Sequence, residues 1–313
     1  MINDKLKILV VCSRKRNYLE GGVAPFIKEQ VQSMLDFGYL FEYFLIQRKG
    51  MIGYLTELKS LKNKINDFQP NIIHAHYGLS GLLANLQRKI PVVTTYHGSD
   101  INKKSNRNFS RLSILLSKWN IFVSERQVKK INIKSKYSVI PCGADTSVFI
   151  PKDKNECRKK LGFDENKIHI LFSKEFSQKV KNYPLAKAAV DKIENAELVE
   201  LIGYSRKEVN LLMNACDVAL MTSFSEGSPQ FIKEAMAVNC PIVSTDVGDV
   251  RQVIDGVENC YLSKYNADDV AKKIKLCLST NERNSKAREK ILENYSLETI
   301  AEKIKVIYKQ YAK

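Results

Sequence analysis

The sequence predicts an α/β protein built from two doubly wound parallel sheets. Short apolar runs, each suited to a buried strand, alternate with longer helix-like segments along the 313 residues. The alternation breaks near Phe149-Ile-Pro151, where Pro141, Gly143 and Pro151 interrupt it, and then resumes. We therefore expect two Rossmann-like domains, residues 1–150 and 151–313, and ligands at the carboxyl ends of their strands.

The first half carries its strand signals in short runs rich in β-branched and aromatic residues. Strands are expected at Lys7–Cys12, Leu40–Ile46, Asn71–His76, Pro91–Tyr96, Ile121–Val123 and Tyr137–Ile140. Helices are expected between them, for example at Pro25–Phe37 and Leu55–Phe68.

The second half repeats this alternation of strands and helices. Strands are expected near Ile168–Ser173, Leu198–Ile202, Val218–Thr222, Pro241–Thr245 and Cys260–Leu262, with helices that include Tyr183–Ile193, Lys207–Ala215 and Phe231–Val238. From Ala267 onward the chain reads as mostly helical, and Ser296 is a candidate N-cap with Glu298 in the first turn. One arrangement open to this last helix is packing against the first domain.

Composition places the chain among globular proteins. At 44% hydrophobic it can bury a sizeable core, and its longest apolar runs, such as Ile8–Cys12, are far shorter than the roughly 20 residues of a membrane span. The first residues include an acid and indicate a strand rather than a signal peptide. Seven scattered cysteines without a CxxC pair argue against a disulfide framework or structural zinc. We expect a cytoplasmic protein.

The positive charge is concentrated in one half. Residues 1–150 hold 23 Lys and Arg against 10 Asp and Glu, a formal charge of +13, whereas residues 151–313 carry +3. Nucleic acid, an anionic membrane surface and a phosphorylated substrate all fit such a bias, and a solvated basic surface fits it equally well.

The most informative motif holds two glutamates. Glu226 and Glu234 follow the apolar run Val218–Thr222, with a Glu-Gly turn and then a helix expected to begin near Ser228-Pro229, with Ser228 as its N-cap and Pro229 in its first turn. Carboxylates accept hydrogen bonds from hydroxyls, and sugars and riboses are rich in hydroxyls. The context suggests a site that binds a nucleotide sugar, although two glutamates eight residues apart are common on amphipathic helices.

Three further signals are weaker alone. Gly21-Gly22 follows the first strand and precedes a helix, as a phosphate-binding loop would, but a flexible turn is the commoner cause. His97, followed by Gly98, ends the fourth expected strand, where a structural and a substrate-binding role are equally probable. His74 and His76 share one face of a strand, and without an evident third ligand a core or cleft-lining role is favoured over metal binding.

Lysines form the last signal. Lys174, Lys179 and Lys181 follow the first strand of the second half, and the sequence contains no Asp-x-Asp pair to carry a metal. If pyrophosphate leaves from this site, lysines must neutralise it. Solvated lysines in a loop are the plain alternative.

Taken together, these motifs resemble those of retaining glycosyltransferases of family 4, which have the GT-B fold of two Rossmann-like domains facing across a cleft. The likeness covers nearly the whole chain. It is carried by Glu226-Gly-Ser-Pro-Gln-Phe-Ile-Lys-Glu234, Gly21-Gly22, His97-Gly98, Ile140-Pro-Cys-Gly-Ala-Asp145, Ala215-Cys-Asp-Val218 and Gly248-Asp-Val250.

The resemblance implies roles for these residues. Glu234 would hold the ribose. Glu226 would bond the donor sugar, helped by main-chain amides of the segment Gly227, Ser228, Pro229 and Gln230, and His97 would contact the sugar near the reacting carbon. Gly21 and Gly22 would approach phosphate and acceptor. Lys181 fits the usual phosphate-binding Lys, but no Arg occupies its partner position, so Lys174, with Lys179 behind it, is the expected substitute.

The resemblance also implies a reaction. A hexose-type sugar would move from a nucleotide diphosphate to an acceptor hydroxyl with retained α-configuration, and neither a metal nor another cofactor is expected. The acceptor would be a sugar or a lipid-linked pyrophosphate, with the basic half at the inner face of the cell membrane during polysaccharide or glycolipid synthesis. The clusters expected to meet lipid are Arg14-Lys15-Arg16 and Lys103-Lys104 with Arg107 and Arg111.

Two alternatives stay open. A GT-B relative that isomerises or epimerises sugar nucleotides would need an acid/base pair, which only the region of His97 and Glu226 offers. A non-catalytic binder of nucleotide sugars or nucleic acid would use the basic half. The aromatic residues are not interleaved with basic ones on one face, so nucleic acid is not an expected partner.

Overall fold

Two compact units make up the protein, which we describe from a computed structural model. The description covers residues 5–14, 22–48, 50–280, 283 and 285–313. The first unit comprises residues 1–142 and 297–313, and the second comprises 143–296. The change of unit therefore falls eight residues before the expected boundary at 150/151, and the C-terminal residues belong to the first unit.

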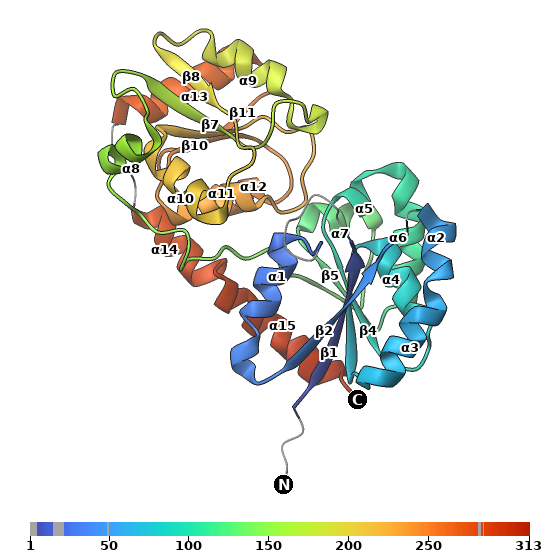
Figure 1. Cartoon of the computed structure of the whole chain (residues 1–313). Helices are drawn as coiled ribbons and strands as arrows, with labels where there is room; N and C mark the ends of the chain where they lie inside the picture. Colours follow the sequence, from blue (N-terminus) through green and yellow to red (C-terminus); the bar gives the residue numbers. More distant parts are fainter. Residues whose placement is uncertain (1–4, 15–21, 49, 281–282, 284) are drawn as a thin grey trace. The chain divides into compact units, whose positions relative to one another are not determined.

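Within the described residues, the first unit contains a six-stranded parallel sheet in the order β2-β1-β3-β4-β5-β6. Figure 1 shows this sheet with helices on both of its sides. Its strands are β1 (Lys7–Ser13), β2 (Leu40–Ile46), β3 (Ile72–His76), β4 (Val92–Tyr96), β5 (Trp119–Phe122) and β6 (Tyr137–Val139). Its helices are α1 (Pro25–Gln32), η1 (Leu35–Phe37), α2 (Gly50–Thr56), α3 (Leu58–Phe68), α4 (Gly78–Asn85), α5 (Ser99–Asn102), α6 (Lys104–Leu116), α7 (Glu125–Ile131) and α15 (Leu297–Tyr311).

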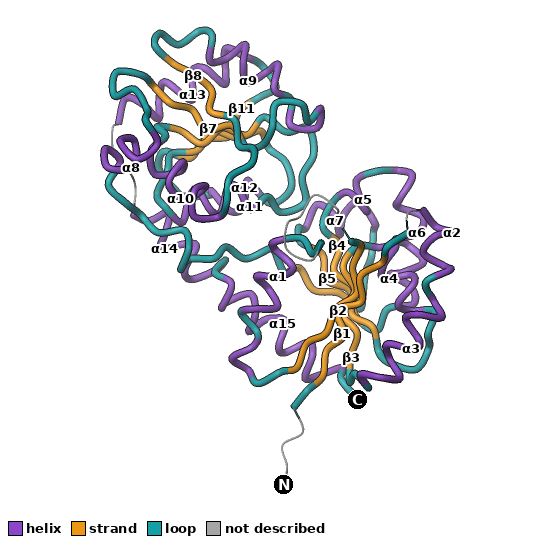
Figure 2. The backbone as a smooth tube through the Cα atoms, viewed as in Figure 1, coloured by secondary structure: helices purple, strands orange, loops and turns teal. Residues whose placement is uncertain are grey.

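Alternating side chains of β1 supply both faces of this sheet. Ile8 and Val10 pack with residues of α1 and α15, whereas Leu9 and Val11 pack with residues of α3 and α4. Figure 2 shows α1 and α15 on one side of the sheet and α3 and α4 on the other. This is the period of two that a strand imposes. The last helix begins directly after Ser296, and its apolar residues Ile300, Ile304 and Tyr308 are part of the first unit's core.

The second unit contains, in its described residues, a five-stranded parallel sheet in the order β11-β10-β9-β7-β8. Its strands are β7 (Ile168–Phe172), β8 (Ala196–Val199), β9 (Val218–Met221), β10 (Ile242–Thr245) and β11 (Cys260–Ser263). Its helices are α8 (Lys154–Leu161), η2 (Lys179–Lys181), α9 (Tyr183–Val190), α10 (Arg206–Ala215), α11 (Gln230–Ala237), α12 (Val250–Ile254), α13 (Ala267–Thr280) and α14 (Ser285–Asn294).

The predicted fold class, α/β with two Rossmann-like parallel sheets, is confirmed. Most expected strands agree with the observed ones to within two residues. Two expected helices are each divided: Pro25–Phe37 becomes α1 and η1, and Leu55–Phe68 begins in α2 and continues as α3. None of the helices in the described part of the chain combines the length and the apolar character needed to cross a bilayer.

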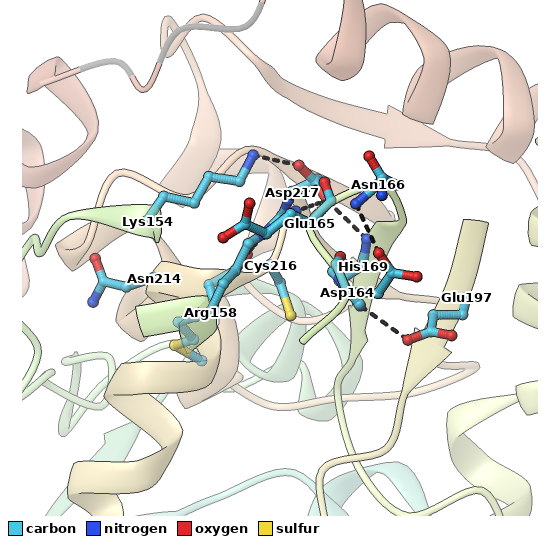
Figure 3. Close-up of polar contacts among 12 residues, drawn as sticks. Lys154, Arg158, Asp164, Glu165, Asn166, His169, Glu197, Asn214, Cys216 and Asp217 are labelled. Carbon is cyan, nitrogen blue, oxygen red and sulfur yellow. Dashed lines mark hydrogen bonds and ion pairs between the residues drawn. The ribbon is translucent and has the colours of Figure 1, made fainter. Parts of the chain in front are cut away.

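A polar cluster fastens α8 to the sheet of the second unit at the amino end of β9 (Figure 3). Asp217 accepts a hydrogen bond from Arg158 Nη2 at 2.7 Å and one from the backbone N–H of His169 at 2.8 Å, and it also pairs with Lys154. Arg158 Nε donates to the carbonyl of Ala215 at 3.0 Å. Asp217 of the Ala215–Val218 motif therefore has a structural role, at the opposite end of the strands from their carboxyl ends.

We predict that Asp217→Ala destabilises the second unit by about 3 kcal/mol, because the Arg158 side chain, 8% exposed, would lose its carboxylate. Lys154→Ala is the control: its side chain is 32% exposed, so the loss should stay below about 1 kcal/mol. Hydrogen exchange of the β7 and β9 amides as a function of urea measures both. Equal losses in the two variants would contradict the assignment.

Candidate functional site

The predicted donor-binding loops of the second unit leave its sheet at the topological switch point. Strand β7 pairs with β8 on one side and with β9 on the other, so the chain turns in opposite directions after β7 and after β9. In open parallel sheets, ligands bind outside the carboxyl ends of the two strands where this divergence occurs. Lys174–Lys181 follows β7, and Glu226–Gln230 follows β9.

Hydrogen bonds hold these two loops together. Thr222, just after β9, donates its hydroxyl to the carbonyls of Lys181 at 2.9 Å and Asn182 at 3.0 Å. The backbone N–H of Phe224 donates to the carbonyl of Val180 at 2.9 Å. The loop that carries the lysines is therefore anchored to the loop that carries the first glutamate.

An ion pair joins the predicted phosphate ligand to the predicted sugar ligand. Lys181 Nζ lies 2.7 Å from Glu226 Oε1, and the two side chains are 15% and 17% exposed. Lys174 and Lys179 are exposed. The structure thus brings Lys181 to the glutamate motif, and it leaves Lys174 and Lys179 at the surface of the same loop.

A buried network shapes the turn between Glu226 and α11. Lys233 Nζ, with a fully buried side chain, donates to Asp249 Oδ2 at 2.9 Å and to Ser228 Oγ at 2.7 Å. Ser228 Oγ also lies 2.6 Å from Asp249 Oδ2. A buried ammonium group requires such partners, because its desolvation costs several kcal/mol.

This network corrects the expected start of the helix. We expected Ser228 as N-cap and Pro229 in the first turn, but α11 begins at Gln230, Pro229 occupies the N-cap position, and no side chain caps it. The Ser228 hydroxyl is committed to Asp249 instead. Of the predicted segment, Gly227, Ser228 and Pro229 are buried and Gln230 is half-buried.

A close backbone contact fixes the same turn from the other side. Gly248 has φ +57°, and a Cβ built on it would lie 2.5 Å from the carbonyl oxygen of Gly227. Both facts require glycine here: the left-handed backbone is unfavourable for other residues, and the space beside Gly227 is taken. The Gly248-Asp-Val250 motif therefore supports the turn that carries Glu226.

The second glutamate is held by a residue that sequence reasoning missed. Glu234 is 4% exposed, and its Oε1 lies 2.6 Å from Arg206 Nη1. The Arg206 guanidinium also stacks over Phe149, 4.6 Å from the ring centroid. Arg206 is the first residue of α10, where the helix dipole disfavours a cation, and the capping box of Ser205 and Glu208 marks that start in the sequence. A cation at this unfavourable helix position was the sequence signal by which Arg206 could have been found.

Several buried polar atoms at this edge have no hydrogen-bond partner among the described residues. They are the hydroxyls of Ser173, after β7, and Ser223, after β9, together with Oε1 of Gln230 and Oδ1 of Asp249. Buried polar side chains are normally hydrogen-bonded. Their concentration beside the Lys181–Glu226 pair marks a place suited to a polar ligand.

In the first unit, the structure describes one residue of the predicted glycine pair. Gly22 is buried with φ +80°, and a Cβ there would meet the Arg14 side chain at 2.5 Å, so this position favours glycine. Gly21, and Lys15 and Arg16 of the first basic cluster, lie outside the described residues.

His97 lies at the carboxyl end of β4, beside the switch point of the first sheet. Asp100 anchors its loop by accepting hydrogen bonds from the backbone N–H groups of Gly98 at 2.9 Å and Gly78 at 3.1 Å. The His97 ring packs against Phe26 and Tyr77, with centroids 4.6 and 4.8 Å away. Burial, together with the neighbouring His74, lowers the pKa of His97 to about 3, so the ring is neutral at physiological pH.

The described residues contain no group of three or more His, Cys, Asp or Glu side chains arranged to hold a metal ion. His74 and His76 are fully buried in the first unit's core, as their predicted strand position allowed.

Comparison with known proteins identifies the family. Residues 9–148 match the family described as Glycosyltransferase Family 4, and residues 174–280 match that described as Glycosyl transferases group 1. The two matches together cover most of the chain.

Individual relatives are distant. A putative teichuronic acid biosynthesis glycosyltransferase of Bacillus subtilis is 24% identical over 253 residues, 69% of this chain and 63% of that protein, so the chain spans less than two-thirds of this relative. The UDP-Gal:α-D-GlcNAc-diphosphoundecaprenol α-1,3-galactosyltransferase of Escherichia coli is 22% identical, with 98% of this chain and 89% of that protein covered.

Among solved structures, sucrose-phosphate synthase from Thermosynechococcus elongatus superposes with a TM-score of 0.84 at 15% identity, covering 98% of this chain and 99% of that one. At this identity the likeness shows the fold alone, which is the GT-B fold. The family matches and the two-glutamate motif agree with it, and the chain belongs to the family 4 glycosyltransferases.

Proposed function

We propose that the chain is a retaining, metal-independent glycosyltransferase that moves a hexose-type sugar from a nucleotide-diphosphate donor to an acceptor hydroxyl. The observation that carries this proposal is the Lys181–Glu226 pair, 2.7 Å apart, at the switch point of the second sheet, with Glu234 in the helix that follows. A cation and two carboxylates so arranged match the pyrophosphate, sugar and ribose of one ligand.

The phosphate end of the donor would be held by Lys181. In this proposal Lys181 and the main-chain N–H groups of Gly227, Ser228 and Gln230 stabilise the negative charge that grows on the leaving diphosphate, since Pro229 has no N–H to donate. Lys174 and Lys179 are exposed on the same loop and would add to the positive field. The sequence has no Asp-x-Asp pair, which supports neutralisation by lysine rather than by a protein-bound metal.

The nucleoside end would be held by Glu234, whose second oxygen would accept from the ribose while Arg206 holds the carboxylate in place. Glu226 would accept from the sugar hydroxyls, and His97 would contact the sugar. The acceptor hydroxyl would attack the anomeric carbon from the face that the diphosphate leaves, and the departing diphosphate would take the hydroxyl's proton.

The relatives support an acceptor in cell-envelope synthesis. One is named for teichuronic acid biosynthesis, and another for an acceptor sugar on diphosphoundecaprenol. We therefore propose polysaccharide or glycolipid assembly, with a sugar or lipid-linked acceptor, as the setting. A sugar-nucleotide isomerase or epimerase, or a binder without activity, is the alternative that product analysis would reveal.

A membrane-facing surface would suit a lipid-linked acceptor, and α6 offers one. Lys104, Arg111, Leu112 and Leu115 lie on its exposed side, and the two leucines are 50% and 75% exposed. Basic and apolar side chains on one helical face are typical of helices that lie on anionic bilayers. Arg107 of the predicted cluster instead donates to the carbonyls of Ile101 and Asn102. We propose contact with the inner face of the cell membrane through α6.

The reaction is tested first by a thermal-shift screen with UDP, GDP, ADP and their sugars, since binding to the folded state raises the melting temperature. With the donor identified by this screen, the substitutions Glu226→Ala and Lys181→Ala should each lower the rate of donor hydrolysis by about a thousandfold. Lys187→Ala, an exposed lysine of α9, is the control. Full turnover by either site variant would overturn the proposal. Loss of turnover in EDTA would overturn metal independence, and an inverted product anomer would overturn retention.

The turn that carries Glu226 is tested separately. Gly248→Ala should cost about 1–3 kcal/mol of stability and abolish the donor-induced rise in melting temperature, because the new Cβ would displace Gly227. Gly256→Ala is a matched control, with φ +70° and nothing within 4 Å of its Cβ, so it should keep the rise. An undiminished rise in Gly248→Ala would contradict this role.

Membrane contact is tested by flotation with vesicles containing anionic lipid. The double variant Lys104→Glu/Arg111→Glu should bind at least roughly tenfold more weakly, because each basic residue near the surface contributes about 1 kcal/mol. Leu112→Ser/Leu115→Ser should also weaken binding. Val306→Ser, a 64% exposed apolar residue on α15, should not. Equal binding by all variants would exclude α6 as the docking surface.

A further inference from the structure

Three histidine rings are stacked in the first unit: His74 and His76 are fully buried, and His97 is half-buried. His74 and His76 come from β3, and His97 follows β4. The ring centroids of His74 and His76 are 4.4 Å apart, and those of His76 and His97 are 5.2 Å apart. Burial lowers the pKa of each of them, to about 3 for His74 and His97, so each ring carries a single proton at physiological pH. The position of that proton on each ring is then set by hydrogen bonds.

The innermost ring is fully engaged. His74 Nδ1 lies 2.5 Å from the hydroxyl of Tyr308, and His74 Nε2 lies 2.7 Å from the hydroxyl of Thr95. Both hydroxyls can donate or accept, so either tautomer of His74 is satisfied. His74 therefore supports His76 by stacking, and it takes no part in the hydrogen bond to His97.

His76 and His97 share one proton position. His76 Nδ1 lies 2.9 Å from His97 Nε2, and His97 Nδ1 lies 3.8 Å from Cys142 Sγ. The other nitrogen of His76, Nε2, is buried and has no hydrogen-bond partner among the described residues. Because both rings are neutral, either His76 or His97 donates across the 2.9 Å contact.

The buried Nε2 of His76 decides between these two arrangements. If His97 donated, His76 would carry its proton on Nε2 and would bury an N–H without an acceptor. If His76 donates from Nδ1, its Nε2 is only a lone pair without a donor. Orphaned buried N–H groups are rarer than acceptors left without a donor, so the second arrangement is favoured.

We propose that His76 is a positioning residue that fixes His97 in the Nδ1–H tautomer, so that His97 offers a hydrogen-bond donor rather than a base. The tautomer itself follows from the hydrogen bonds. Only the identity of the group that His97 binds, a sugar oxygen, rests on the proposed function. His97 Nε2 is occupied by His76, and Nδ1–H is the group left to donate, with Cys142 Sγ at 3.8 Å a weak competitor. A neutral N–H can polarise or orient a sugar oxygen without removing a proton from it.

The tautomers can be observed directly in the full-length protein. The chain has four histidines, and the fourth, His169, belongs to the second unit and serves as an internal reference. Long-range ¹H–¹⁵N correlation spectra of protein labelled with ¹⁵N-histidine distinguish Nδ1–H from Nε2–H imidazoles. We expect Nδ1–H for both His76 and His97. A wild-type spectrum with His97 in the Nε2–H form would overturn the proposal.

Two substitutions test whether His76 sets the tautomer. His76→Leu removes the donor, and His97 should then move to the Nε2–H form. His76→Asn keeps a side-chain N–H near the position of Nδ1, and it should keep His97 as Nδ1–H. Retention of the wild-type His97 spectrum in the leucine variant would contradict a positioning role. Unchanged exchange protection of β1 in both variants shows that the unit still folds.

Turnover adds a second readout. With the donor identified by thermal shift, His76→Leu should lower kcat for donor hydrolysis by about a hundredfold with an unchanged donor KM, and His76→Asn should restore most of it. Equal rates for leucine and asparagine variants would contradict the proposal. If no donor supports turnover, the proposed function fails, and the spectra still decide the tautomer.

Discussion

The loop that carries Glu226 in the second unit depends on one buried ion pair, that between Lys233 and Asp249. A fully buried ammonium group is stable only when its partners are in place, and removal of one partner typically costs 3–5 kcal/mol. Here the partners are a carboxylate from the segment before α12 and the hydroxyl of Ser228. The pair therefore joins α11, the turn after Glu226 and the segment of Gly248 into one unit.

That constraint explains why the site residues occupy their positions. The Glu226 turn cannot move away from Gly248 without exposing or separating Lys233 and Asp249, and it cannot move closer because Gly227 already contacts Gly248. The lysine loop is attached to this turn through Thr222 and Phe224. Rigid loops on a parallel sheet are a good support for charged groups that must meet a ligand in one geometry.

Much of this arrangement could be predicted from sequence, and the failures have identifiable causes. Strand positions follow from apolar runs, because a buried parallel strand needs a continuous run of apolar side chains. Their places after strands singled out Glu226, Lys181 and His97, and the resemblance to family 4 gave them their predicted roles. Ser228 was misjudged as a cap because its competing partner, Asp249, is 21 residues away in the chain. Arg206 was missed because its partner Glu234 lies 28 residues further on.

The sequence by itself determined the fold class, the order of the loops and which of them carry charged groups, because apolar periodicity and turn residues act over short stretches of chain. Tertiary structure decided which groups are paired: Lys181 with Glu226, Arg206 with Glu234, and His76 with His97. Glu226, singled out in the sequence as a carboxylate that follows a strand, forms an ion pair with Lys181 in the folded chain. Pairing requires contact between residues far apart in the chain, and only the register of the sheets and the packing of helices on them bring such residues within hydrogen-bond distance.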